Sequence, residues 1–86
     1  MKTCKVVINS KKGCYPCKQL ESFLPTIRKM FPDTEFELRK KKENDILSYP
    51  RTTVYLIVEG KLHLWSMLIG YNGGAEYVDY LRTFLK

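Results

Sequence analysis

Two cysteines, Cys14 and Cys17, stand between a predicted strand and a predicted helix, and this arrangement constrains the fold more than any other feature of the chain. Residues 4–9 are apolar and rich in β-branched side chains, as expected for a buried strand. After the cysteines, apolar residues recur at offsets of three, four and seven, which indicates an amphipathic helix over residues 15–30. The cysteine pair therefore lies where the chain leaves a strand and enters a helix.

This position favours thiol chemistry at Cys14. The first turn of a helix has unpaired backbone N–H groups and the positive end of the helix dipole, and both stabilise a thiolate. We therefore expect the pKa of Cys14 to be lowered, and the positive charges of Lys11 and Lys12 to lower it further. Cys17 lies inside the helix and is expected to be the less exposed of the two cysteines.

The size and composition of the chain limit the classes of protein it can belong to. Its 86 residues allow one domain over 1–86 with a single core, and we expect a monomer. The longest apolar run, 54–58, is too short to span a membrane, and the N-terminus lacks the apolar block of a signal peptide. Three cysteines, an odd number, argue against a secreted disulfide framework. We therefore expect a cytoplasmic protein that does not associate with membranes.

The formal net charge of +6 is high for this length, and residues 39–42 are the densest part of it. A basic run of this kind is common in proteins that bind nucleic acid. However, no aromatic side chains are interleaved with it, as stacking on a single strand would require. We therefore expect no nucleic acid partner, and interpret the charge as attracting an acidic protein or a small anionic thiol.

The remainder of the chain predicts five more elements: a strand at 34–39, a short helix at 44–47, strands at 52–58 and 62–69, and a helix at 75–85. The strands at 52–58 and 62–69 form a hairpin. Gly60 lies midway between Pro50 and Gly70, so the two arms are expected to be equal in length. The strand at 52–58 is apolar on both faces and should be central. In the strand at 34–39, alternation places Phe36 and Leu38 on one face and Glu35 and Glu37 on the other. Pro25 must either kink or restart the first helix.

The order of these elements resembles that of the thioredoxin and glutaredoxin superfamily over nearly the whole chain. In that superfamily a Cys-x-x-Cys pair follows the first strand and opens the first helix, and a proline precedes the hairpin. A Gly-rich turn, here 70–74, then leads to the last helix. The resemblance implies an α/β, thioredoxin-like fold with the order βαβαββα and a mixed four-stranded sheet flanked by helices.

The same resemblance implies a cis-proline beside the cysteine pair. Pro50 is our candidate, because a cis bond before proline costs far less than a cis bond elsewhere. A second register remains open, since residues 51–54 look like the segment that precedes this proline in many glutaredoxins. In that register Tyr55 would take the place of the proline.

Features of two subfamilies are mixed around the cysteines. In glutaredoxins a lysine three residues before the first cysteine contacts a carboxylate of glutathione, and Lys11 matches that position. In contrast, Tyr15-Pro16 places the proline beside the second cysteine, as thioredoxins do. Small phage-encoded redoxins combine such features in a similar way.

The resemblance implies a thiol-disulfide oxidoreductase that reduces protein disulfides or glutathione mixed disulfides. Cys14 would attack the substrate disulfide, and Cys17 would then resolve the mixed disulfide. No bound cofactor is expected, the electron donor would be glutathione or thioredoxin reductase, and ribonucleotide reductase is a partner that such small redoxins often serve. The implied substrate-binding residues are Lys11, Tyr15, Pro16, Tyr49, Pro50, Gly70 and Tyr71.

A non-catalytic interaction module of the same fold, with structural or metal-binding cysteines, is the alternative. Two cysteines at this spacing form half of a tetrahedral zinc site, and the other half would have to come from Cys4 and His63. These two residues do not form a second close pair in the sequence. We therefore expect no metal site.

Overall fold

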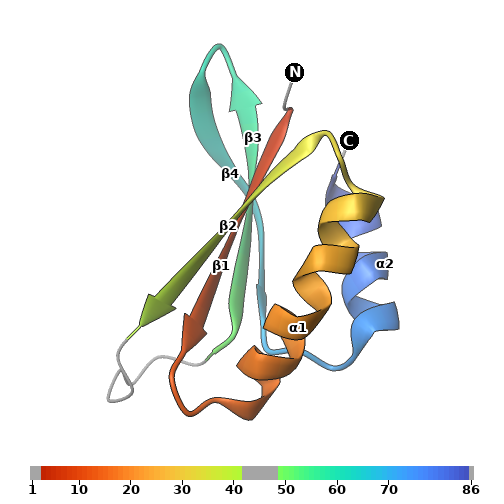
Figure 1. Cartoon of the computed structure of the whole chain (residues 1–86). Coiled ribbons are helices and arrows are strands. Elements are labelled where there is room, and N and C mark those ends of the chain that lie inside the picture. Colours follow the sequence, from red (N-terminus) through yellow and green to blue (C-terminus); the bar gives the residue numbers. More distant parts are fainter. Residues whose placement is uncertain (1–2, 42–48, 86) are drawn as a thin grey trace.

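The computed structural model describes residues 3–41 and 49–85 (Figure 1). Its elements are β1 (Cys4–Lys11), α1 (Tyr15–Met30), β2 (Thr34–Lys41), β3 (Arg51–Val58), β4 (Lys61–Ile69) and α2 (Gly74–Phe84). They confirm six of the predicted elements, with β1 and β2 each two residues longer than expected. The predicted short helix at 44–47 lies outside the described residues. None of the described helices is long and apolar enough to cross a membrane.

The four strands form one mixed sheet in the order β2-β1-β3-β4. β1 pairs parallel with β2 and antiparallel with β3, and β3 pairs antiparallel with β4. The parallel pair is the one that α1 connects, as a strand-helix-strand unit requires. The predicted sheet is therefore confirmed, and so is the interior position of β3.

The hairpin contains an irregularity that the sequence pattern did not predict. Val54 pairs with Ser66 but Tyr55 pairs with Leu64, so Trp65 is the extra residue of a β-bulge. The expectation of equal arms is therefore wrong, because the bulge adds one residue to β4 and reverses the facing of this strand at that point. The Trp65 ring packs edge-on against Phe84 of α2, with 6.3 Å between centroids.

Both described helices pack against the same face of the sheet (Figure 1). The side chains buried between them come from two strands and both helices: Val6, Ile8, Leu20, Leu24, Ile27, Val54, Tyr77 and Leu81. α1 continues through Pro25, which is exposed on its solvent side, so Pro25 does not restart the helix. This packing fixes the start of α1, and thus the cysteine pair, relative to the ends of β1 and β3.

A buried hydrogen bond connects α2 to the start of β3. The hydroxyls of Thr52 and Tyr77 lie 2.7 Å apart, and both residues are almost completely buried. Burial raises the pKa of the Tyr77 phenol, so this group stays neutral, and either hydroxyl can donate in this hydrogen bond. Because Thr52 follows Pro50 by two residues, the hydrogen bond holds the segment that leads to the functional site.

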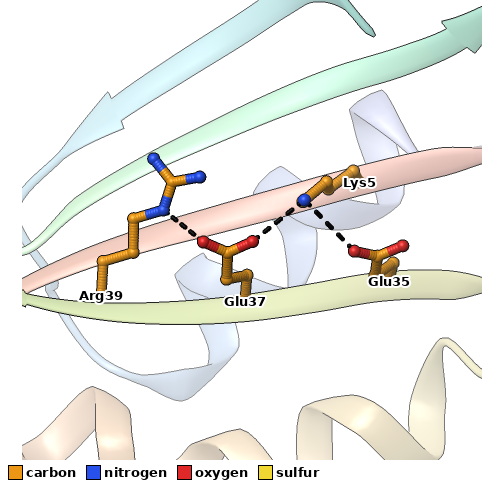
Figure 2. A network of polar contacts seen from close by, with 4 residues as sticks. All are labelled: Lys5, Glu35, Glu37 and Arg39. Atoms are coloured by element: carbon orange, nitrogen blue, oxygen red, sulfur yellow. Dashed lines mark hydrogen bonds and ion pairs between the residues drawn. The ribbon is translucent and has the colours of Figure 1, made fainter. Parts of the chain in front are cut away.

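The opposite face of β1 and β2 contains a network of ion pairs (Figure 2). Lys5 Nζ lies 3.2 Å from Glu35 Oε2 and 2.9 Å from Glu37 Oε1, and Arg39 Nε also contacts Glu37. The Lys5 side chain is only 18% exposed. The network confirms the predicted facing of β2, in which the glutamates lie on one face and Phe36 on the other, against the core.

The network makes stability depend on pH in the acid range. Hydrogen bonds from Arg39 and then Lys5 lower the pKa of Glu37 from 4.5 to about 2. Because the folded pKa is the lower one, this stabilisation is complete above pH 4.5 and is lost as the pH falls towards 2. We expect Glu37→Gln to be less stable than the wild type at neutral pH and equally stable near pH 2. Urea unfolding across this range measures the difference, and an equal difference at both ends would contradict the assignment.

Candidate functional site

Cys14 and Cys17 form a disulfide at the start of α1, with 5.2 Å between their Cα atoms. Cys14 is the N-cap residue, and its sulfur accepts a hydrogen bond from the Cys17 N–H at 3.3 Å. Tyr15 and Pro16 form the first positions of the helix, where a proline removes no hydrogen bond. The Cys14 sulfur is therefore placed at the unpaired N–H groups that stabilise a thiolate.

The two cysteines differ in exposure. Cys17 is 1% exposed, whereas Cys14 is partly exposed and Tyr15 beside it is 71% exposed. This is the order of exposure that the sequence predicted. A substrate sulfur can approach Cys14 from solvent, but Cys17 only through Cys14.

A tight turn connects β1 to the cysteine pair. The Cys14 N–H donates to the Lys11 carbonyl at 3.3 Å, and Gly13 has a φ of +80°. Residues with a Cβ atom rarely adopt this left-handed conformation, so the turn requires glycine. β1 is longer than predicted, so the turn is shorter and Lys11 is the last residue of the strand.

Pro50 lies beside the cysteine pair. The Tyr49–Pro50 peptide bond is cis, and the Tyr49 carbonyl oxygen lies 3.7 Å from the Cys14 sulfur. The Gly70 N–H donates to the Pro50 carbonyl at 2.7 Å. Three segments far apart in the sequence thus meet at Cys14. Tyr55, the candidate of the second register, lies within β3 and pairs with Lys5, so the structure has the register with Pro50.

Two cations lie near the Tyr49 ring. The Lys11 ammonium lies 5.7 Å from the centroid of its ring, and the Arg51 guanidinium lies 5.8 Å from it. Both distances are within the range of cation–π attraction. Arg51 was not among the predicted site residues, although its position directly after Pro50 is a signal that could have identified it.

Tyr71 packs towards α2. Its ring centroid lies 5.7 Å from that of Tyr77, and its side chain packs against the core. Gly70, which precedes it, has a φ of +94° and contacts Pro50. The structure therefore brings Gly70 to the predicted site, while the Tyr71 ring serves mainly to attach this loop to α2.

A zinc site that combines Cys4 and His63 with the cysteine pair does not fit this fold. Cys4 is fully buried at the start of β1, and Cys14 follows the end of this eight-residue strand. At about 3.3 Å per residue, the two are separated by roughly 25 Å. His63 pairs with Leu56, which pairs with Cys4, so His63 also lies at the far end.

A group of polar residues lies on the β2 side of the cysteines, and none of them was among the predicted site residues. The Ser10 hydroxyl donates to Glu21 Oε2 at 2.6 Å, and Lys40 Nζ lies 3.2 Å from Glu21 Oε1. The Ser10 hydrogen bond, and then Lys40, lower the pKa of Glu21. The spacing of Lys18 and Glu21, three residues apart on one helix, was the available signal.

Comparison with known proteins identifies the fold. No family model and no curated protein matches the sequence. Among solved structures, thioredoxin f2 of Chlamydomonas reinhardtii matches with a TM-score of 0.75 and 19% identity, over 96% of this chain and 80% of that one. Trichomonas vaginalis thioredoxin gives 0.74 and 18%, over 94% and 79%. The protein has a thioredoxin fold.

A third structure has the same arrangement. Oxidized mitochondrial thioredoxin 3 of Saccharomyces cerevisiae matches with a TM-score of 0.74 and 16% identity, over 98% of this chain and 81% of that one. At these low sequence identities, the similarity to the three structures shows the fold alone. Within this thioredoxin fold, the Cys14–Cys17 pair, Pro50 and Gly70 lie together at one end of the sheet.

Proposed function

We propose that this protein is a thiol-disulfide oxidoreductase that reduces disulfides through Cys14 and Cys17. The observation that carries the proposal is the difference in exposure between the two cysteines. Cys14 is partly exposed and accepts the Cys17 N–H at the start of α1, while Cys17 is buried behind it. This is the arrangement that an attacking thiol and a resolving thiol require.

The reaction has two exchanges. The Cys14 thiolate attacks one substrate sulfur, the substrate S–S bond breaks, and the departing thiolate takes a proton from solvent. The Cys17 thiolate then attacks Cys14 in the mixed disulfide and releases the second substrate thiol. The substrate is reduced to a dithiol and the protein is left as the Cys14–Cys17 disulfide, so a thiol reductant must restore it.

The surroundings of Cys14 provide contacts for a substrate. Tyr15 is exposed next to it, and Pro16 and Gly70 are partly exposed nearby. Pro50 is buried, so its contribution is to position the Tyr49 carbonyl and Gly70. The Tyr49 carbonyl, 3.7 Å from the Cys14 sulfur, is a hydrogen-bond acceptor for the reduced thiol. These groups orient the incoming disulfide so that its sulfur meets Cys14.

The reductant and the partners are also part of the proposal. Lys11 places an ammonium group over the Tyr49 ring beside the site, and we propose that it contacts a carboxylate of glutathione. This supports glutathione as reductant and glutathione mixed disulfides as substrates, while Pro16 supports thioredoxin reductase. We further propose that the protein acts in the cytoplasm as a monomer, with ribonucleotide reductase among its candidate substrates.

Measuring insulin reduction with each electron donor tests the proposal. We expect the protein to accelerate the reaction well beyond the donor alone, either with glutathione and its reductase or with thioredoxin reductase. Cys4→Ser is the matched control and should keep full activity, because Cys4 is buried at the far end of β1. Absence of acceleration with both donors and with dithiothreitol would contradict the proposal and favour a non-catalytic interaction module.

A further inference from the structure

A cavity of about 440 Å³ lies beside the cysteine pair. Of its described lining residues, the proposed function uses Lys11 alone. Four lysines line it, Lys11, Lys12, Lys18 and Lys40, together with Ser10 and Glu21. We call it the lysine pocket. Lys40 belongs to β2, and Pro50 directly precedes β3, which lies on the other side of β1. The lysine pocket therefore flanks the cysteines on the side away from Pro50.

The lysine pocket is strongly positive. Among the described lining residues the one carboxylate is that of Glu21, which already accepts hydrogen bonds from Ser10 and Lys40. Ser10 is 1% exposed, so it anchors this carboxylate at the floor. Among the described lining residues, four ammonium groups thus face one carboxylate, which Lys40 contacts. An anionic group entering the pocket would also meet the ammonium groups of Lys12 and Lys18.

The position of the lysine pocket connects it to the reacting sulfur. Gly13 also lines the cavity, and the next residue is Cys14. A segment of polypeptide whose disulfide is attacked by Cys14 can therefore extend into the pocket within a few residues. The cations are all lysines, whose point charges on flexible stems adapt to carboxylates in varied positions, whereas arginine suits fixed bidentate recognition.

We propose that the lysine pocket binds acidic side chains of the protein substrate, in the segment next to the disulfide that Cys14 attacks. This inference rests on the proposed function and adds a substrate class to it. The charges of the pocket attract such a segment before the sulfurs meet, which raises the association rate and makes it dependent on salt. Disulfide substrates with neutral flanking residues lack this advantage.

Single-turnover reduction of two model peptides tests the substrate preference. Each peptide contains an intramolecular disulfide, flanked in one by glutamates and in the other by glutamines. The protein is reduced beforehand with dithiothreitol, which is then removed. We expect the acidic peptide to react about tenfold faster at low salt, and this advantage to shrink to below about threefold in 0.5 M salt. Equal rates for the two peptides at low salt would overturn the inference.

Two double variants, each of which removes two lysine charges, show whether the preference for the acidic peptide arises in the lysine pocket. Lys18→Gln with Lys40→Gln should remove most of the preference for the acidic peptide and leave the neutral peptide within about twofold of the wild-type rate. Lys29→Gln with Lys61→Gln is the matched control and should keep the preference, since these residues lie at the end of α1 and at the hairpin tip. Equal loss of preference in both variants would assign it to net charge and overturn the role of the pocket.

A binding measurement separates failure of this inference from failure of the proposed function. The acidic peptide, with serines in place of its cysteines, is titrated into the oxidised protein while the amide signals of Gly13 and Lys18 are followed by NMR. Saturable shifts in the wild type would support peptide binding in the lysine pocket, even if no disulfide is reduced. These shifts should be absent from the double variant Lys18→Gln with Lys40→Gln. Peptide reduction without such shifts would uphold the function and overturn the pocket. Shifts at these amides with S-methylglutathione, but none with the acidic peptide, would identify a small-thiol site and overturn the inference as well.

Discussion

Replacing Cys14 by serine should lower the rate of disulfide reduction by about a thousandfold or more. A serine hydroxyl is not ionised at neutral pH and does not attack a disulfide sulfur at a useful rate, so the first exchange would be lost. Cys14 is partly exposed and is the cysteine that a substrate can reach, while Cys17 is 1% exposed. The measurement is insulin reduction under the donor conditions that support the wild type.

Cys17→Ser provides the complementary result. This variant keeps the attacking thiol and lacks the resolving one, so it should form a stable mixed disulfide with its substrate. Non-reducing gel electrophoresis with mass spectrometry detects the product, and the linkage should map to Cys14. Turnover by Cys14→Ser above about a tenth of the wild-type rate would show that Cys14 is not the nucleophile, provided that its circular dichroism spectrum is native.

Leu20→Ala should destabilise the protein by about 3 kcal/mol. Leu20 is fully buried in α1, between the cysteine pair and the rest of the core, and contributes to the cluster that joins both helices to β1 and β3. Truncation of a buried leucine to alanine costs about 2–5 kcal/mol, since it removes apolar contacts and leaves a cavity. A domain of this size has a total stability of roughly 4–13 kcal/mol, so the loss is a large part of it.

Thermal and urea unfolding measure the effect of Leu20→Ala, and the Tm should fall by about 10–25 °C. The neighbouring residue Gln19 is exposed, so Gln19→Ala is the matched control and should stay within about 0.5 kcal/mol of the wild type. Leu20→Met keeps the volume and should cost less than about 1.5 kcal/mol. A loss below about 1 kcal/mol in Leu20→Ala would contradict the role assigned to this side chain in the core.

Local patterns predicted the secondary structure well. The apolar stripe that includes Leu20 and Leu24 predicted α1 over the residues that the structure assigns to it. The alternation of Glu35, Phe36 and Glu37 predicted the facing of β2. Both patterns arise because each helix or strand buries one of its sides. The spacing of apolar residues within that element therefore reveals the buried side. The β-bulge at Trp65 has no comparable local signature, since it depends on how β4 meets β3 and α2.

The sequence by itself determined that two thiols stand at the junction of a strand and a helix, because period and composition act over a few residues. Only the tertiary structure decided what surrounds them. It placed the Tyr49 carbonyl, 35 residues away along the chain, at the Cys14 sulfur, and it brought Lys40 of β2 to Glu21 of α1. Such contacts follow from strand order and helix packing, which no short stretch of the chain encodes. The dithiol is thus a local feature, whereas the groups that would select its substrates are assembled by the fold.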